Sequence, residues 1–388
     1  MMWENVKLGE IAPSRKSKKE ISPHETVWNL TLDQIESETG HIVGKQFITA
    51  SSASQSSSYV DENNVLYSKL RPYLNKVIIP DSFAVATTEL VPLYPDKSKL
   101  DNTYLLYYLR SKKFVDWASG VVSGAKMPRV VMKKFWAYKI PLPPLKTQKR
   151  IVALLDKAQA LIDKRKEQIA LMDQLIQSLF YDMFGDPVIN PKGWEICKIK
   201  NVVDIRGRVG WKGYKKTDLR NSGPLVLGAT HLTKEGNINL KSPVFISNEK
   251  YEESPEIVIK VGDLLIVQRG NTIGKVGAIT EDIGKATINP CILIMRPKKV
   301  DINYLRFYFV NEKINQKLWQ MNNSSAQPML TQKDLNAFNI PFPPLGLQST
   351  FAQKVQKIEI QKEAMTASLK ELEDNFNALM QRAFKGEL

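Results

Sequence analysis

The sequence predicts a mixed α/β (α+β) fold in which two globular bodies are joined by two long, antiparallel helices that pair as a coiled coil. Three observations support this fold class. The 388-residue chain is a tandem duplication, each copy ends in a long segment with apolar residues every 3.5 positions, and strand-like runs alternate with helical stretches elsewhere. The predicted bodies are residues 1–145 and 187–345, and the predicted helices are residues 146–186 and 346–388.

The duplication is visible as residues that recur 200 positions apart. The recurring pairs are Asp101/Asp301, Tyr104/Tyr304, Leu105/Leu305, Tyr108/Tyr308, Pro128/Pro328, Lys133/Lys333, Gln148/Gln348, Leu179/Leu379 and Phe184/Phe384. The segment Ile140-Pro-Leu-Pro-Pro-Leu145 also returns as Ile340-Pro-Phe-Pro-Pro-Leu345. At the front, Trp3-Glu4 matches Trp194-Glu195 with an offset of 191, so the second copy carries about nine extra residues in its variable part.

In each body, strand-like runs precede a helix-like stretch. The runs are Val65–Lys69, Val77–Ile79, Asp263–Gln268 and Cys291–Met295, and the helical stretches follow Asp101 and Asp301. We therefore expect both bodies to contain helices and strands.

Pro-rich turns at residues 141–144 and 341–344 separate each body from its helix. Pro lacks the amide hydrogen that a helix interior needs, so these turns cannot lie inside a helix, and we interpret them as hinges. After the first helix, Gly185-Asp-Pro187 and Asn190-Pro-Lys-Gly193 stop it and lead into the second body.

Each predicted helix contains one set of positions that recur at alternating spacings of four and three. The first set is Ile151, Leu155, Ala158, Ile162, Arg165, Ile169, Met172, Ile176, Leu179 and Met183, and the second is Phe351, Val355, Ile358, Lys362, Met365, Leu369, Leu372, Phe376, Leu379 and Ala383. This period is typical of a coiled-coil seam. Some 37 residues at about 1.5 Å each make a helix of roughly 55 Å, which suits a spacer.

Each seam contains one cation, Arg165 or Lys362. A single polar residue in a seam can fix the register of pairing, but a long side chain can also carry its charge to solvent. We expect the second behaviour for both residues.

The composition is that of a folded, water-soluble protein: 43% of the residues are hydrophobic and 24% are charged, which excludes collagen-like and disordered chains. No apolar run approaches the roughly 18 residues of a membrane helix, and the first 13 residues lack the apolar core of a secretory signal. We therefore expect a cytoplasmic protein.

The net charge of +15 is concentrated in the two bodies. Residues 1–145 carry 19 basic and 14 acidic side chains, and residues 187–345 carry 23 and 14, whereas both predicted helices are nearly neutral. Two basic bodies indicate a polyanion held at two places, and nucleic acid is the commonest one in the cytoplasm. A solvated basic face remains the alternative on charge alone.

Motifs that would carry catalysis fail at specific residues. Gly270-Asn-Thr-Ile-Gly274-Lys275 resembles a phosphate-binding loop, but only three residues separate the glycines and Val276 replaces the Ser or Thr that would bind magnesium. We expect a hairpin turn there. Asn289-Pro290-Cys291-Ile292 resembles the Asn-Pro-Pro-aromatic motif of adenine methyltransferases but lacks the second Pro and the aromatic residue.

Nuclease and metal motifs fail in the same way. Asp81 and Glu89 resemble a metal-dependent nuclease, yet Val91 occupies the position of the required Lys. The three histidines, His24, His41 and His231, are scattered and lie beside no nucleophile motif, and Cys197 and Cys291 belong to no zinc-binding pattern. We expect this chain to contain no catalytic, cofactor-binding or metal-binding residue.

The order of body, Ile-Pro-x-Pro-Pro-Leu turn and long helix, followed by the same three parts again, resembles the specificity subunits of type I restriction-modification systems. The resemblance covers the whole chain and includes the stretch from Ser325-Ala-Gln-Pro-Met-Leu330 to Leu345. It implies a non-catalytic subunit whose bodies are target-recognition domains, each reading one half of a bipartite DNA site. It also implies that the paired helices set the gap between the halves and dock methyltransferase subunits.

The resemblance further implies the partners: double-stranded DNA, two methyltransferase subunits and, through the complex, restriction/translocase subunits, with no membrane. S-adenosylmethionine, ATP and magnesium would bind to those subunits, and this chain would need no cofactor. The charge pattern leads to a compatible expectation independently, because two basic bodies on a rigid spacer fix the distance between two DNA contacts.

Candidate DNA contacts are Arg, Lys, Asn and Gln in loops that follow strands, since these side chains can reach base edges or phosphates. In the first body they are the loop of residues 51–58 and Lys69, Arg71, Lys126 and Arg129. In the second they are Gln268, Arg269, Asn271, Thr272, Lys275 and Gln327, of which Arg269 corresponds to Arg71 and Gln327 lies within a residue of the place of Lys126. A further basic cluster contains Arg206, Arg208, Lys212, Lys215, Lys216 and Arg220, with Trp211 and Tyr214 between them.

Two other classes of protein remain as alternatives. The first is an autonomous DNA-modifying enzyme, a methyltransferase or nuclease with an unrecognised site. The second is a basic coiled-coil adaptor, which explains neither the duplicated bodies nor their charge.

Overall fold

The computed structural model describes residues 3–209, 214–321 and 329–388. By its internal contacts the chain divides into two compact units. Unit 1 contains Met1–Lys166 and Ala367–Leu388, and unit 2 contains Glu167–Thr366. Among the described residues, none of the helices combines the length and apolar character that crossing a membrane requires.

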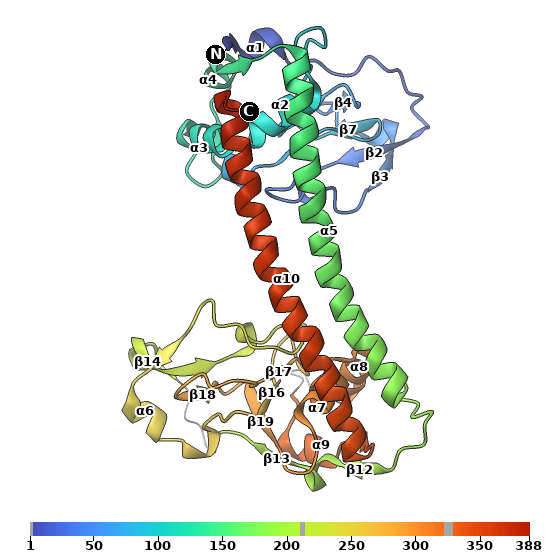
Figure 1. Ribbon diagram of the computed structural model, residues 1–388, viewed down its shortest axis with the longest axis vertical. Helices are drawn as coiled ribbons and strands as arrows, with labels where there is room; N and C mark the ends of the chain where they lie inside the picture. The colour runs from blue at the N-terminus through green and yellow to red at the C-terminus, as the bar shows by residue number, and fades with distance from the viewer. Residues whose placement is uncertain (1–2, 210–213, 322–328) are drawn as a thin grey trace. The chain divides into compact units, whose positions relative to one another are not determined.

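The predicted mixture of helices and strands is confirmed (Figure 1). The α-helices are α1 (Leu8–Ile11), α2 (Asn102–Arg110), α3 (Lys112–Gly120), α4 (Met132–Ala137), α5 (Leu145–Phe184), α6 (Asn248–Glu252), α7 (Ile302–Val310), α8 (Glu312–Gln320), α9 (Gln332–Ala337) and α10 (Leu345–Lys385). The long helices α5 and α10 each contribute a segment to both units.

The strands fall into two sets, one in each unit. Those of unit 1 are β1 (Glu4–Lys7), β2 (Thr26–Leu30), β3 (Phe47–Thr49), β4 (Ser58–Val60), β5 (Val65–Ser68), β6 (Val77–Ile78), β7 (Ala84–Ala86), β8 (Leu90–Leu93), β9 (Val122–Ser123), β10 (Arg129–Val130) and β11 (Lys139–Leu142). Those of unit 2 are β12 (Ile196–Lys198), β13 (Val203–Arg206), β14 (Leu219–Leu227), β15 (Phe245–Ile246), β16 (Leu264–Val267), β17 (Val276–Ala278), β18 (Ala286–Ile288), β19 (Ile292–Pro297) and β20 (Asn339–Pro341).

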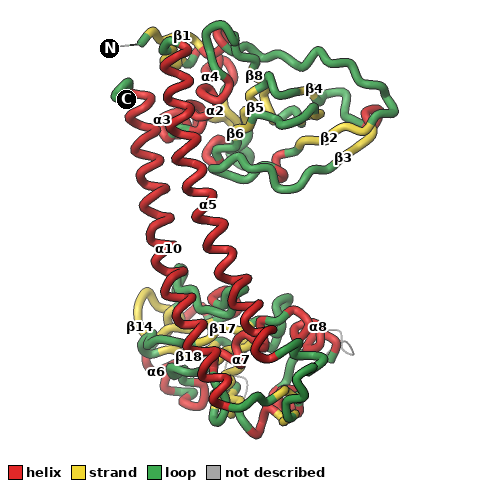
Figure 2. The backbone as a smooth tube through the Cα atoms, turned by 45° about the vertical axis from the view of Figure 1, so that its right-hand side comes forward, coloured by secondary structure: helices red, strands yellow, loops and turns green. Residues whose placement is uncertain are grey.

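In unit 1, two sheets lie outward from the segments of α5 and α10 (Figure 2). The nearer sheet has the antiparallel order β6-β5-β8, and its residues Val65 and Tyr67 share a core with Tyr104 and Leu105 of α2. The outer sheet has the order β3-β2-β7-β4, in which β2 and β7 are parallel.

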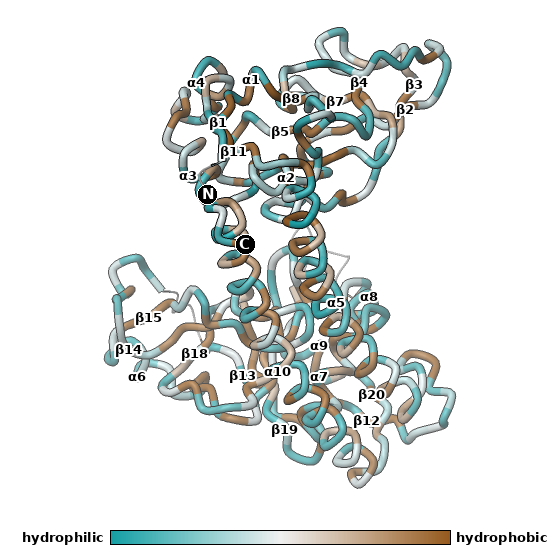
Figure 3. Tube along the Cα trace, turned by 45° about the horizontal axis from the view of Figure 1, so that its top comes forward, coloured by the Kyte–Doolittle hydropathy of each residue, from teal (hydrophilic) through white to brown (hydrophobic). Residues whose placement is uncertain are grey.

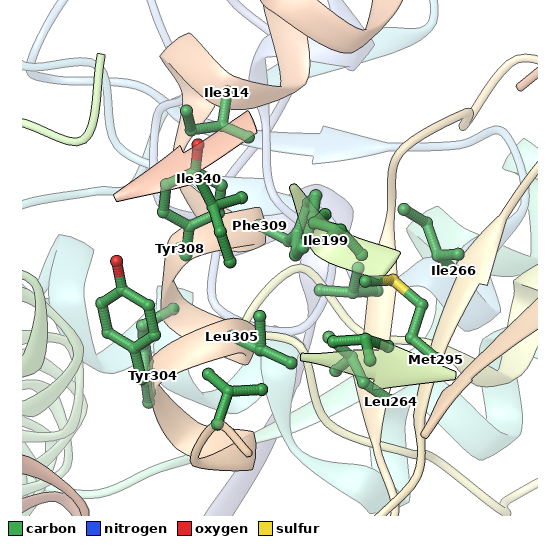
Figure 4. Packing of buried hydrophobic residues seen from close by; sticks show 14 of the residues in the cluster. Ile199, Leu264, Ile266, Met295, Tyr304, Leu305, Tyr308, Phe309, Ile314 and Ile340 are labelled. Carbon is green, nitrogen blue, oxygen red and sulfur yellow. The ribbon is translucent and has the colours of Figure 1, made fainter. Parts of the chain in front are cut away.

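Unit 2 repeats this arrangement. Its inner sheet has the antiparallel order β13-β19-β16-β17, and its outer sheet has the order β15-β14-β18 with β14 and β18 parallel. Figure 4 shows the core between α7 and the inner sheet. Its labelled residues include Tyr304, Leu305, Tyr308, Phe309, Ile199, Leu264, Ile266 and Met295. The four predicted strand runs are present as β5, β6, β16 and β19, and the helices after Asp101 and Asp301 are α2 and α7.

The long helices pair antiparallel within unit 1. Ile151 and Leu155 of α5 are buried in the same core as Phe384 of α10, whereas Lys166 Nζ lies 3.2 Å from Glu373 Oε1. As residue numbers rise along α5, those of the contacted α10 residues fall. Figure 3 shows apolar and polar residues alternating in bands along both helices.

In unit 2 the two helices also pair antiparallel. The ring of Phe351 lies 5.7 Å from that of Phe180 and 5.2 Å from that of Phe184, and Lys362 Nζ donates a hydrogen bond to Asp173 Oδ1. The expectation that Lys362 carries its charge into solvent is therefore wrong, because a carboxylate on the other helix pairs with it. Of the other predicted seam residues, Ile162, Ile176 and Val355 are buried, and Ile169, Ile358, Leu369, Leu372 and Phe376 are half-buried.

The Pro-rich turn at residues 141–144 is fixed to its body by a buried glutamine. Gln148 Oε1 accepts a hydrogen bond from the Asp101 amide at 2.8 Å, and its Nε2 donates to the carbonyl oxygens of Lys99 and Pro143 at 2.7 Å. The second copy repeats the contacts with Asp301 and Pro343 through Gln348. The recurrence of this glutamine in the sequence therefore has a structural reason, and the turn is a fixed joint rather than a free hinge.

A buried ion pair distinguishes unit 2 from unit 1. Arg306 of α7, only 2% exposed, donates from Nη1 to Glu359 Oε1 of α10 at 2.7 Å and from Nε and Nη2 to the Glu235 carbonyl at 3.1 Å. The corresponding residue of unit 1 is Leu106. This pair ties the unit 2 segment of α10 to α7.

Replacing Glu359 by alanine should lower the free energy of unfolding by about 3 kcal/mol, because the buried guanidinium of Arg306 would lose its carboxylate. Denaturant unfolding of the variant measures this loss. Glu363→Ala, an exposed position four residues further along α10, is the matched control and should cost less than about 0.5 kcal/mol. The double variant Arg306→Met/Glu359→Leu should recover most of the stability, and equal losses for Glu359→Ala and Glu363→Ala would contradict the assignment.

Candidate nucleic-acid interface

The four basic residues predicted in the first body come together in one place. The Arg71 amide donates to the Pro128 carbonyl at 2.8 Å, and the Val130 amide donates to the Lys69 carbonyl at 2.9 Å. The segment after β5 therefore lies against the segment of residues 126–130. Two exposed apolar side chains, Tyr73 (52%) and Met127 (46%), belong to the same two segments.

Arg129 differs from its neighbours because its charge is already paired. Its Nε donates to both carboxylate oxygens of Glu89 at 3.1 Å, and its Nη2 donates to Oε1 at 2.8 Å. These hydrogen bonds raise the pKa of the Arg129 guanidinium. Since Nη1 also donates to the Met127 carbonyl at 3.4 Å, Arg129 holds the loop in position.

Unit 2 builds the equivalent place from β16 and the residues after it. The Leu330 amide donates to the Gln268 carbonyl at 2.9 Å, and Arg269 forms an isolated β-bridge with Met329. Asn271 and Thr272 are exposed, and Lys275 is half-buried. Gln327 lies outside the described residues.

The bridges correct the predicted equivalence of Arg71 and Arg269. Leu70 bridges Arg129 in unit 1, and Arg269 bridges Met329 in unit 2, so Arg269 occupies the place of Leu70. Arg71 then corresponds to Gly270, and both have a positive φ, 50° and 97°. The predicted equivalence is wrong by one residue, because pairing Arg71 with Arg269 assumes an offset of 198, whereas β5 and β16 align with an offset of 199.

Three arginines of the predicted basic cluster, Arg206, Arg208 and Arg220, contact other residues of unit 2. Arg206 pairs with Asp204, with Nη2 to Oδ2 at 2.7 Å, and Arg220 Nη1 donates to the Thr217 carbonyl at 2.7 Å. The Arg208 guanidinium lies 4.2 Å over the Tyr214 ring, while its Nε and Nη1 are buried and have no hydrogen-bond partner among the residues that the structure describes. Lys215 and Lys216 are exposed. Lys212 and Trp211 lie outside the described residues.

The loop of residues 51–58 lies beside a basic run that the sequence reasoning missed. Lys16 Nζ donates to the Ser57 carbonyl at 3.3 Å, and the Ser17 amide donates to the Tyr59 carbonyl at 2.8 Å. The run contains Arg15, Lys16, Lys18 and Lys19. The offset of 191 that aligns the starts of the two copies also aligns Arg15 with Arg206. This correspondence could have indicated the basic run from the sequence.

The motifs rejected as catalytic have structural roles. Gly270–Lys275 forms the turn between β16 and β17, as predicted, with the Gly274 amide donating to the Val267 carbonyl at 3.0 Å. Asp81 pairs with Lys45, and Glu89 with Arg129. Within the described part of the chain, His, Cys, Asp and Glu form no group that could hold a metal ion.

Both units combine an inner antiparallel sheet, an outer mixed sheet and a segment of each long antiparallel helix, with basic loops at matching places, which defines a tandemly duplicated protein with two basic surfaces. The sequence matches the family described as "Type I restriction modification DNA specificity domain" over residues 2–171 and 191–374. The chain belongs to this family. It is a type I specificity subunit, a component that is not itself the catalyst.

Individual relatives agree with the family. The type I restriction enzyme MjaVIII specificity subunit of Methanocaldococcus jannaschii is 25% identical over 92% of this chain and 86% of its own length. The EcoDI specificity subunit of Escherichia coli is 27% identical over 47% of this chain and 41% of its own length.

Solved structures support the fold. A chain from a study of complex assembly and conformational transition of the type I restriction-modification system matches with a TM-score of 0.65 at 21% identity, covering 100% of this chain and 98% of that one. The type I S subunit of M. genitalium matches with a TM-score of 0.53 at 13% identity, covering 98% and 96%.

Proposed function

We propose that this chain reads a bipartite, gapped DNA sequence for a type I restriction-modification complex in the cytoplasm, with one half-site for each body. Residues 1–145 and 187–345 are the two recognition domains, and α5 and α10 set the gap between the half-sites. The observation that carries the proposal is the repetition of one basic loop, after β5 in unit 1 and after β16 in unit 2, on equivalent sheets.

The residues that contact DNA fall into two groups. The first group can reach base edges and lies in the repeated loops or, for Lys126, on the segment packed against the first of them. It contains Lys69, Arg71, Lys126, Gln268, Arg269, Asn271 and Thr272. Lys215, Lys216 and Lys275 supply charge to the phosphates, whereas Arg129 and Arg206 act mainly through the carboxylates that they position.

Salt should weaken DNA binding by the complex steeply. The three lysines assigned to the phosphates release counterions when they bind, so the logarithm of the association constant should fall with the logarithm of salt concentration with a slope of about −3 or steeper. Titrations between about 50 and 200 mM salt measure the slope. A slope near zero would contradict the proposal that these basic residues contact the DNA phosphates.

The α5 helix carries exposed leucines that fit a protein partner. Leu154 and Leu161 in unit 1 are 40% and 55% exposed, and Leu171 and Leu175 in unit 2 are each 49% exposed. The α10 residues 200 positions further on are polar: Lys354, Gln361, Glu371 and Asn375. One apolar pair in each unit supports the docking of two methyltransferase subunits on α5, through which restriction/translocase subunits join the complex.

The variant Leu154→Glu/Leu161→Glu should therefore release one of two methyltransferase subunits. Burying two leucines contributes about 3 kcal/mol or more, so affinity at that site should fall about a hundredfold or more. Mass measurement of the assembled complex would give the stoichiometry. Gln361→Glu on α10 is the control and should leave the assembly intact; the same loss in both variants would contradict docking on α5.

The alternative function, an autonomous DNA-modifying enzyme, makes a different prediction. Purified chain mixed with labelled S-adenosylmethionine and DNA should transfer no label, and transfer should appear only when the methyltransferase subunit is added. In this proposal S-adenosylmethionine, ATP and magnesium bind to the partner subunits. Methylation or cleavage of DNA by the chain alone would overturn it.

A further inference from the structure

The backbone of Arg71 takes a conformation that its side chain disfavours. Its φ is 50° and its ψ is 64°, in the left-handed region, where a residue with a Cβ costs about 1–2 kcal/mol. Arg71 also precedes Pro72, and a residue before proline is normally pushed to extended conformations. The equivalent residue of unit 2, Gly270, has φ 97° without this cost.

The surrounding structure holds Arg71 in place from both sides. Its amide donates to the Pro128 carbonyl at 2.8 Å, and its own carbonyl accepts from the Leu74 amide at 2.9 Å. Pro128 is in turn fixed by the neighbouring Arg129, which is locked to Glu89 by three hydrogen bonds. A strained residue persists only where its neighbours determine its conformation in this way.

No polar contact of the Arg71 side chain with the described part of the chain offsets the strain. The side chain is exposed, and within the described residues its guanidinium makes no hydrogen bond or ion pair. Asn75, the other left-handed residue of this turn, behaves differently, because its Nδ2 donates to the Arg110 carbonyl at 3.1 Å. Tyr73 and Met127 are exposed beside Arg71, and Lys126 adds charge.

We infer that Arg71 is a specificity-determining residue of the first body, held by its strained backbone so that its free guanidinium reads a guanine in the half-site of that body. This rests on the proposed function. Arginine binds the O6 and N7 acceptors of guanine through two parallel donors, the commonest specific contact in the major groove. The glycine at this place in unit 2 has no side chain that could reach a base.

The test compares Arg71→Gly with Asn75→Gly in the complete complex with methyltransferase subunits. Both substitutions place glycine at a left-handed position, so neither should lower the thermal midpoint through backbone strain. The probe is a library of DNA duplexes with randomised bases, incubated with S-adenosylmethionine and sequenced for methylated adenine.

For Arg71→Gly we expect discrimination to fall about tenfold or more at one guanine position, in the half-site that persists when residues 194–338 are exchanged. Asn75→Gly should leave the recognised sequence unchanged. An unchanged sequence for Arg71→Gly, a uniform loss over all sequences that indicates a phosphate contact, or loss at a base other than guanine would each overturn the inference. A parent complex that recognises no bipartite sequence would instead contradict the proposed function.

Discussion

Inserting four residues at the junction of the two units should lengthen the gap in the recognised DNA by one or two base pairs and leave both half-site sequences unchanged. The junction lies between Lys166 and Glu167 in α5 and between Thr366 and Ala367 in α10. Four helical residues add about 6 Å, while DNA rises about 3.4 Å per base pair.

The expected result depends on the helical period. Four residues make roughly one turn, so insertion after Ile169, three residues beyond the α5 junction, alone or with a matching insertion after Thr366, keeps the apolar seam nearly in phase. Two residues rotate the seam by about 200° and should abolish activity or methyltransferase docking. Mapping methylated sites distinguishes these outcomes. A four-residue variant that stays active with the parental gap, or a two-residue variant that behaves like the parent, would show that the helices do not set the length of the gap.

Exchanging residues 194–338 for those of a relative with another specificity should replace one half-site completely and leave the other half-site and the gap unchanged. The exchanged segment contains the inner and outer sheets of unit 2 and leaves the Pro-rich turn and Gln348 in place, so the hydrogen bond from Gln348 to the Pro343 carbonyl is kept. The other partner of Gln348, the backbone amide of Asp301, can be supplied by the relative's residue at that position. Each body has its own buried core, which allows one to change without the other.

The reciprocal exchange of residues 3–138 is the matched control, because these residues correspond to 194–338 in the first copy. It should replace the other half-site. Complexes with either exchange should methylate hybrid sites that share one half with the parent. Two new half-sites from a single exchange would mean that the bodies do not read DNA independently.

The architecture could be predicted because it depends on periodic and repeated residues. The 3.5-residue period of residues 151–183 and 351–383 reports the antiparallel helices, and Gln148 and Gln348 recur because each fastens a helix to its body. Strands β5 and β16 were visible as apolar runs between turn residues. These signals are local in the sequence.

The details that could not be predicted depend on contacts between distant residues. Lys362 pairs with Asp173, 189 positions away, and no local pattern indicates which carboxylate meets the lysine. Arg71 is equivalent to Gly270 rather than to Arg269. This equivalence follows from the β-bridges Leu70–Arg129 and Arg269–Met329, which join residues far apart in the sequence. The exposed Leu154 and Leu161, by contrast, are seven residues apart and could have been found by searching for a second apolar stripe on α5.

The central claim is that this chain gives a methyltransferase a bipartite DNA specificity, one half-site for each body. The most direct measurement is the set of DNA sites methylated by the methyltransferase subunit with and without this chain. We expect methylation only in the presence of this chain, at one sequence made of two defined blocks separated by a gap of constant length. Methylation at a continuous sequence, at the same sites without the chain, or by the chain alone would contradict it.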